Sequence, residues 1–259
     1  MLKKLLIINS LILIVFFMLT TNSIAIHEEK STNQIVKEDD EEVDYLKEEV
    51  EEETKIADPL IIWNKAMFHF NDKLYFWLLK PVSKGYSKVV PKDIRASVSN
   101  FFNNIATPIR FVNNLLQFKL KNAGNEFVRL IINTTVGVGG LGDVAKTEFN
   151  IQMNKEDLGQ TLGTYGIGHG IYLIWPFIGP SSLRDTVGYV GDRFLDPITY
   201  LVTEERLTNS EGIGVVTYDK INETSFKIGD YEAFKESAVD PYEGLRSAYV
   251  QYRNKAVEK

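Results

Sequence analysis

Residues 162–185 read LGTYGIGHGIYLIWPFIGPSSLRD, and the interpretation of the fold depends on this run. Its glycines allow backbone conformations that other residues resist, whereas its large side chains are mostly apolar or aromatic. The run is too short and too interrupted for an ordinary membrane-spanning helix, and it is too apolar for a solvated loop. We therefore expect a glycine-rich apolar loop region that lies against protein, lipid or both.

Helical signals dominate the chain on both sides of this run. Four dipeptides place a capping residue before a proline, as in the first turn of a helix: Asp58-Pro59, Thr107-Pro108, Asp196-Pro197 and Asp240-Pro241. Apolar residues at spacings of three and four predict a first helix from residue 60 to 77, which Pro81 is expected to end. Further helices are expected at 94–104, 108–134 and 181–195, and strand patterns are scarce. The sequence predicts an all-α fold.

The first predicted helix is apolar on more than one face. A stripe such as Trp63, Phe70 and Trp77 is most often ordinary core, but Ile62 and Phe76 lie on other faces of the same helix. A helix that is apolar most of the way round is buried on several sides or contacts lipid. Together with the uncharged segment 159–179, this surplus favours helices that lie in the plane of a bilayer leaflet.

The N-terminal 57 residues differ in character from the rest. Residues 1–25 follow the plan of a signal peptide, with Lys3 and Lys4 before an apolar stretch and Ser23-Ile24-Ala25 as the cleavage site; retention as a membrane anchor is the alternative. Residues 26–57 are expected to be an acidic disordered linker, because residues 26–53 hold 13 acidic side chains against 3 lysines; a solvated single helix is the second interpretation. Residues 58–259 are then one helical domain, and the 44% hydrophobic residues of the full chain provide ample material for its core.

Several classes of function lack the residues that they need. Cysteine is absent, and the three histidines, His27, His69 and His169, form no metal-binding or catalytic motif, so neither a metal nor an enzymatic site is expected. His169 is interpreted as a satisfied loop side chain, with a pH sensor as the alternative. No basic stripe exists for nucleic acid, so that partner is not expected either.

The segment GVGGLG at residues 137–142 satisfies the spacing of a dinucleotide-binding loop. That interpretation also requires a βαβ unit and an acidic residue about 20 positions later to hold the ribose. Residues 158–165 contain no acidic side chain, so we expect no cofactor. The interpretation that we favour is structural: Gly137, Gly139, Gly140 and Gly142 allow a close approach of backbone segments or act as a hinge.

Several stretches together resemble the MlaA (VacJ) family of outer-membrane phospholipid-transport proteins. The resemblance covers residues 58–253 and rests on DPLIIWNKAMFHFND from Asp58, VPKDIRASVSNFFNN from Val90, RLIINTTVGVGGLGDVA from Arg129, the run 162–185, and VDPYEGLRSAYVQYR from Val239. It implies a ring-like bundle of in-plane amphipathic helices in the inner leaflet of the outer membrane, with an amphipathic channel. Mislocalised phospholipids would pass from the outer leaflet through this channel to a periplasmic lipid carrier, beside a trimeric porin.

Family members usually carry an acylated cysteine, and this sequence has none. Anchoring as a lipoprotein is therefore not expected, and the protein's apolar surface, a partner or a retained signal would hold it at the periplasmic side of the outer membrane. The alternative to transport is a structural scaffold that supports the membrane or a porin without moving lipid; a lipid-degrading enzyme is a third interpretation.

A phospholipid channel must hold a charged headgroup and apolar chains at once. The candidates for the lipid path are the large side chains of the glycine-rich run: Tyr165, Ile167, Tyr172, Trp175 and Phe177. Arg184 and Arg193 are candidates for the headgroup, although salt bridges to nearby carboxylates such as Asp185 and Asp196 explain them equally well.

Overall fold

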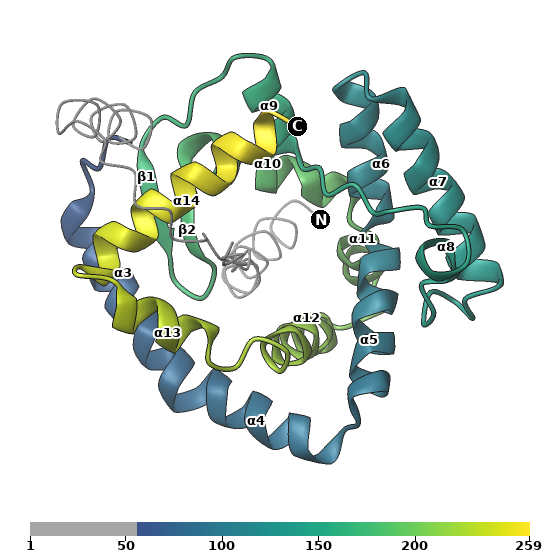
Figure 1. Cartoon of the computed structure of the whole chain (residues 1–259), viewed down its shortest axis with the longest axis horizontal. Helices are drawn as coiled ribbons and strands as arrows, with labels where there is room; N and C mark the ends of the chain where they lie inside the picture. Colours follow the sequence, from purple (N-terminus) through teal and green to yellow (C-terminus); the bar gives the residue numbers. More distant parts are fainter. Residues whose placement is uncertain (1–55) are drawn as a thin grey trace, which may run out of the picture.

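The computed structural model describes residues 56–259, and the predicted signal peptide and nearly all of the acidic linker lie outside these residues. In Figure 1, the long helices α3, α4 and α5 follow one another along the outline, and the α6–α7 pair continues it. The hairpin of β1 and β2 and helix α12 lie further inward in this view. The prediction of a mostly helical fold is confirmed for the described residues.

Helix α3 (Ile61–Leu74) continues through a π-helical turn, η1 (Tyr75–Leu79), into α4 (Lys80–Val89). The prediction that Pro81 ends the helix is therefore wrong. A proline inside an α-helix collides with the carbonyl group four residues before it. In a π-helical turn the backbone hydrogen bonds join residues five apart, so the carbonyl groups of η1 are displaced by one residue relative to those of an α-helix. Pro81 thus occupies the first turn of α4, where its missing N–H group is harmless.

The next helices are α5 (Lys92–Ile105), α6 (Thr107–Leu116) and α7 (Leu120–Thr135). A single helix over 108–134 was expected, but residues 117–119 form a turn that folds α7 back against α6. Phe118 has a φ of 57° at this turn, a left-handed conformation that sequence rules assign to glycine. Neither proline nor glycine signals the break, so the pattern concealed it.

The glycine-rich run, which was predicted to be an apolar loop region, contains two short strands. Its centre forms an antiparallel hairpin of β1 (Tyr172–Trp175) and β2 (Gly179–Ser182), with Tyr172 opposite Ser182 and Trp175 opposite Gly179. The all-α description is corrected by these two strands. Two asparagines of α3, two helical turns apart, bond the edge of β1 that faces away from β2. Asn64 donates to the Tyr172 carbonyl and accepts from the Ile174 N–H group. Asn71 donates to the Trp175 carbonyl and accepts from the Phe177 N–H group.

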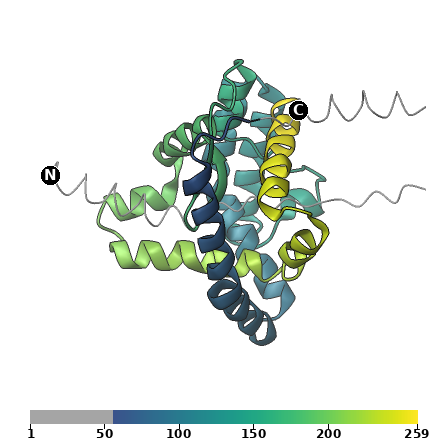
Figure 2. The ribbon, with the colours of Figure 1, turned by 90° about the vertical axis from the view of Figure 1, so that its left-hand side faces the viewer.

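The hairpin leads into α10 (Leu183–Asp192), which packs against α9 (Leu158–Thr164) at a glycine contact. A Cβ atom on Gly188 would lie 2.2 Å from the Gly159 nitrogen, so the two backbones are in direct contact there. The remaining elements are the short helix α8 (Val144–Thr147), the 3₁₀ turn η2 (Arg193–Leu195), α11 (Pro197–Thr203), α12 (Asn209–Thr224), α13 (Asp230–Ser237) and α14 (Pro241–Val257). Helix α14 contacts α9 and β2. In Figure 2, α14 lies on the side of the body opposite to the end of α12 that joins α11.

Two of the four predicted proline caps have the expected geometry. Asp196 accepts a hydrogen bond from the Ile198 N–H group and Asp240 accepts one from that of Tyr242, so both cap their helices. Thr107 is the first residue of α6. Asp58 is not a cap: its carboxylate bonds the Asn64 side chain and the Tyr242 hydroxyl, and α3 begins only at Ile61.

The buried apolar cluster lies between α3, β1 and α14: Ile56, Phe68, Tyr172, Ile174, Tyr242, Tyr249 and Val250. Large apolar side chains are also exposed elsewhere on the body, including Ile62 (86% exposed), Trp77 (76%), Phe118 (80%) and Phe194 (73%). An exterior this apolar is unusual for a monomer in water. Between residues 56 and 259, no helix has both the length and the apolar character that crossing a bilayer requires.

Candidate functional site

A cavity of about 380 Å³ lies among the inner faces of seven helices and the hairpin. The junction of α5 and α6, helices α9 to α12, the hairpin and α14 all contribute to its wall. Its lining residues are Phe102, Ala106, Ile109, Asp157, Trp175, Ile178, Pro180, Ser181, Asp185, Thr186, Tyr189, Asp192, Arg193, Asp196, Ile198, Val216, Asp219, Tyr249, Tyr252 and Arg253. The cavity is thus built from segments more than 150 residues apart in the sequence.

One part of the wall is apolar. Phe102 and Ile109 come from the α5–α6 junction, Ile198 from α11 and Val216 from α12, while Trp175 and Ile178 come from the hairpin. The Trp175 indole N–H donates to the Thr186 hydroxyl over 2.9 Å, which fixes the ring beside the cavity. Such a surface suits hydrocarbon, because it offers little to bond a polar group.

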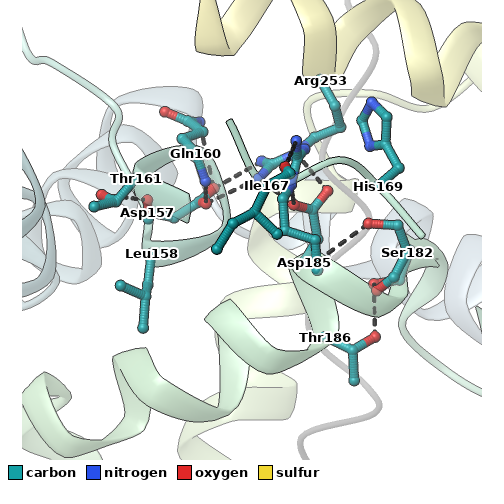
Figure 3. A network of polar contacts seen from close by, with 12 residues as sticks. Asp157, Leu158, Gln160, Thr161, Ile167, His169, Ser182, Asp185, Thr186 and Arg253 are labelled. Carbon is teal, nitrogen blue, oxygen red and sulfur yellow. Dashed lines mark hydrogen bonds and ion pairs between the residues drawn. The ribbon is translucent and has the colours of Figure 1, made fainter. Parts of the chain in front are cut away.

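Arg253 organises the charged side of the wall. Its guanidinium group bonds both oxygens of Asp157, at 2.7 and 2.9 Å, and it forms an ion pair with Asp185 at 2.7 Å. These contacts join α14 to the N-cap of α9 and to the first turn of α10 (Figure 3). Burial acts to raise the pKa of Asp185, but Arg253 and Arg184 outweigh it and hold this pKa at about 2.

A second ion pair lies at the η2 turn. The Arg193 guanidinium group bonds Asp196 at 2.5 Å, and its carbon lies 5.4 Å from the centre of the Tyr189 ring. Asp196 is also the N-cap of α11, so the pair joins η2 to the next helix. Burial lowers the pKa of Arg193 from its usual value. A guanidinium group beside an apolar wall can contact a phosphate group.

Two further carboxyl groups of the wall, those of Asp192 and Asp219, have no ion pair within the described residues. Asp192 accepts hydrogen bonds from Asn113 and from the Leu158 N–H group, at 2.7 and 2.9 Å, and burial raises its pKa to about 7. For Asp219, burial and the nearby Glu223 raise the pKa to about 6, against the attraction of lysines at 220 and 227. Neither carboxylate has the opposite charge and hydrogen bonds that would fully offset the cost of its burial.

Of the residues predicted for the site, the cavity includes Trp175 and Arg193. The other four lipid-path candidates lie outside it. Tyr165 and Ile167 are exposed near the end of α9, and Phe177 has a φ of 66° in the hairpin turn with its ring 5.1 Å from that of Phe70. Tyr172 is fully buried in the apolar cluster, because the alternation of β1 directs it away from the cavity-lining hairpin face.

Arg184 is not part of the cavity wall. It is buried, bonds Asp185 at 2.8 Å and donates to the Ile167 carbonyl, so it fastens the start of α10 to the preceding loop.

The glycines at 137–142 form a turn after α7. A Cβ atom on Gly137 would lie 2.3 Å from the Gly142 carbonyl oxygen, whereas one on Gly140 would lie 2.6 Å from the Asn104 side chain. Gly139 and Gly142 have no such close neighbour, although Gly139 has a φ of 68°.

Sequence reasoning missed most of the wall. Asp185 and Asp196 were noted only as cap or salt-bridge residues, and Asp157, Asp192, Asp219 and Arg253 were not proposed for the site. A local signal existed for Arg253, which lies one helical turn after Tyr249 in a polar helix. Among the described residues, no group of acidic or histidine side chains has a metal-binding arrangement.

The fold and the cavity together define a helical protein with an apolar exterior and an internal cavity that is apolar on one side and charged on the other. The family model for the MlaA lipoprotein matches residues 56–256, so the chain belongs to the MlaA family.

Related proteins extend over most of the chain. The intermembrane phospholipid transport system lipoprotein MlaA of Escherichia coli (strain K12) is 33% identical over 199 residues, which cover 75% of this chain and 76% of the relative. An uncharacterized protein of Rickettsia conorii is 31% identical over 205 residues and 79% of each chain. A solved structure described as "Structural basis for maintenance of bacterial outer membrane lipid asymmetry" is similar with a TM-score of 0.68 and 31% identity, over 78% of this chain and 99% of that chain.

Proposed function

We propose that this protein removes mislocalised phospholipids from the outer leaflet of the bacterial outer membrane and passes them through its cavity toward a periplasmic carrier. This activity maintains lipid asymmetry and breaks no covalent bond. It fits the MlaA family, whose relative from Escherichia coli is named for intermembrane phospholipid transport. The partners that we propose are phospholipid, the outer membrane, a trimeric porin and a soluble lipid carrier.

The observation that supports this proposal most directly is the two-sided cavity. Its apolar wall, including Ile109, Trp175 and Val216, suits acyl chains, and the ion pair of Arg193 lies in the same cavity. Arg193 is the guanidinium group that we assign to the phosphate, and Trp175 lies on the path of the chains. Phospholipids require both environments within one molecule's length, whereas a scaffold requires neither.

The exterior supports a position within a leaflet. Apolar side chains face outward on the outlining helices, including Trp77 on η1, Ile94 on α5 and Phe127 on α7. We propose that these helices lie in the membrane plane and form a ring around the cavity. Tyr165, Ile167 and Phe177 would then belong to the surrounding apolar surface, and Tyr172 would support the hairpin from behind. Attachment through this surface requires no acylated cysteine, and the sequence contains none.

The test is to fill the cavity without changing the exterior. A strain that lacks the gene is complemented with the wild type, with Ala106→Phe in the cavity wall, or with Ala233→Phe, a matched substitution on an exposed position of α13. Phospholipid in the outer leaflet is then quantified by chemical labelling of intact cells. We expect the wild type and Ala233→Phe to restore asymmetry, and Ala106→Phe, present at equal amounts, to fail.

Restoration by the cavity-filled variant would contradict transport and would favour a structural scaffold, because a scaffold needs only the exterior. Ile198→Trp narrows the same cavity from α11. If both variants fail, a local folding defect at the α5–α6 junction does not explain the loss. Incubation of the purified protein with labelled phospholipid, followed by mass analysis, tests whether the protein cleaves lipid. A hydrolysed product would overturn the proposal that no covalent bond is broken.

A further inference from the structure

The charges of the cavity wall do not balance. Five carboxyl groups and two guanidinium groups line it. Arg253 pairs with Asp157 and Asp185, Arg184 outside the wall supplies Asp185 with a second positive charge, and Arg193 pairs with Asp196. Asp192 and Asp219 have no ion-pair partner among the described residues. When these two are ionised the wall has a surplus of negative charge, although the ligand proposed above has a phosphate group.

Asp219 is placed to meet a ligand. It follows Val216 by one helical turn on α12, so an apolar and an acidic side chain lie side by side on the face of α12 that lines the cavity. No side chain or backbone group of residues 56–259 donates a hydrogen bond to its carboxylate. Its neighbours Lys220 and Lys227 both bond Glu223. Its carboxylate is therefore available to a group inside the cavity.

Asp192 has a different setting on the same wall. Its oxygens accept from Asn113 and from the Leu158 N–H group, which hold the carboxyl group in place but supply no positive charge. A cation in the cavity would stabilise both carboxylates in their ionised form. Burial raises the pKa of each above the usual range, which is the effect expected of carboxyl groups that lack a counter-ion.

We propose that the cavity selects phospholipids whose zwitterionic headgroup ends in a primary ammonium, as in phosphatidylethanolamine, and that Asp219 binds this ammonium while Arg193 faces the phosphate. This inference rests on the proposed function and adds the headgroup class. An anionic glycerol headgroup brings a phosphate charge and no cation, so it increases the negative surplus. A quaternary choline headgroup is positive but donates no N–H bond to Asp219.

The experiment measures which lipid the full chain binds. Purified protein in detergent is incubated at pH 7.5 with micelles that contain equal amounts of dioleoyl phosphatidylethanolamine and dioleoyl phosphatidylglycerol, and bound lipids are counted by native mass spectrometry. The same measurement on Ala106→Phe gives the lipid bound outside the cavity, which is subtracted. A third arm replaces the ethanolamine lipid by dioleoyl phosphatidylcholine.

We expect the cavity-dependent fraction of the wild type to favour the ethanolamine lipid by roughly 3- to 10-fold, the range that one partly buried charge interaction provides. Asp219→Asn should reduce this ratio toward one, and Asp219→Glu should retain most of it. Asp93→Asn, an exposed carboxylate in the first turn of α5, is the matched control and should behave as the wild type. The choline lipid should bind less than the ethanolamine lipid.

The two proposals fail separately. If Ala106→Phe binds as much lipid as the wild type, the cavity holds no lipid and the proposed function is lost. If the cavity-dependent fraction exists but contains both headgroups equally, or if Asp219→Asn leaves the ratio unchanged, only the headgroup selectivity is wrong. Thermal unfolding of each variant, followed by circular dichroism, shows whether it is folded.

Discussion

Arg253 is the residue whose loss should cost the most stability, because it compensates two carboxylates at once. Its side chain is 4% exposed, and its ion pairs to Asp157 and Asp185 join α14 to α9 and α10. Arg253→Met leaves both carboxylates without that charge, and we expect the free energy of unfolding to fall by about 3–5 kcal/mol. Urea denaturation of the full chain in mild detergent measures it.

The matched control is Arg206→Met, because Arg206 is exposed and the structure gives it no ion pair among the described residues. Its substitution should change the free energy of unfolding by less than about 0.5 kcal/mol. Equal losses in the two variants would mean that the contacts of Arg253 contribute nothing beyond those of a surface arginine.

Asp219 should make stability depend on pH in a direction opposite to that of a paired carboxylate. Its pKa of about 6 in the folded protein lies above the value near 3.9 of an unfolded chain. Between these values the folded state binds more protons, so the contribution of Asp219 to stability falls as the pH rises from about 4 to about 6.

The difference in unfolding free energy between the wild type and Asp219→Asn should therefore decrease by about 1–2 kcal/mol over that interval, with solvent screening limiting its size, and should be constant above pH 7. Lys220, Glu223 and Lys227 surround the site in both proteins, so their own titration largely cancels. Urea denaturation at pH 4.5, 5.5 and 7 measures the difference; a constant difference would show that Asp219 titrates normally.

Residues whose partners are close in sequence were predictable. Asp196 and Asp240 cap helices through N–H groups two residues away, so the pair of an acid and a proline predicted their role. Asp58 also precedes a proline, but its carboxylate bonds Tyr242, 184 residues away, so the prediction that it caps a helix was wrong. Of the site residues, Trp175 was found because its run is unusual in composition, and Arg193 because a phospholipid headgroup requires a cationic partner, whereas Asp219 lies in an ordinary helical pattern.

At the scale of helices, two glycines should respond oppositely to the same substitution. Gly188 of α10 contacts the backbone of α9 at Gly159, where a new Cβ atom would lie 2.2 Å from nitrogen, whereas Gly214 in the middle of α12 has nothing within 4 Å. We expect Gly188→Ala to destabilise the protein by about 1–3 kcal/mol or more through overpacking. Gly214→Ala should stabilise it by about 0.5–1 kcal/mol through helix propensity.

Thermal unfolding of the two variants measures whether each substitution stabilises or destabilises the protein. A stabilising Gly188→Ala would mean that α9 and α10 can separate at little cost, contrary to the close contact. Because both substitutions add one methyl group within a helix, intrinsic propensity is the same and the difference reports packing.

The hairpin shows why an element can escape prediction. Strands β1 and β2 are four residues each, and no alternation of four residues stands out from a glycine-rich run. What fixes β1 is the pair Asn64 and Asn71, more than 100 residues earlier, which bond its edge as a third strand would. On α3 these asparagines look like ordinary polar positions, because the sequence does not reveal what they face.

The whole molecule separates an apolar exterior from an amphipathic interior, and no single segment encodes that separation. The cavity combines the α5–α6 junction with α14, and its ion network depends on contacts such as Arg253 to Asp157, 96 residues apart. The resemblance to a family predicted an amphipathic channel, whereas the residues that line the cavity could be identified only from the structure. The exterior was easier, because a helix that is apolar on several faces can be recognised locally.

The sequence contains three tryptophans, and two of them distinguish the exterior from the interior. Trp77 on η1 is 76% exposed, and Trp175 lines the cavity. In variants that retain one tryptophan, with the others replaced by phenylalanine, vesicles of phospholipid brominated in the acyl chains should quench both, since bromine quenches only on near contact. Ala106→Phe should leave the quenching of Trp77 unchanged, because in the proposed position that residue contacts the bilayer directly. The same substitution should remove most of the quenching of Trp175, because lipid would no longer enter the cavity. If Ala106→Phe reduced both equally, the variant would have lost its membrane contact as a whole; if it reduced neither, acyl chains would reach Trp175 by a route other than the cavity.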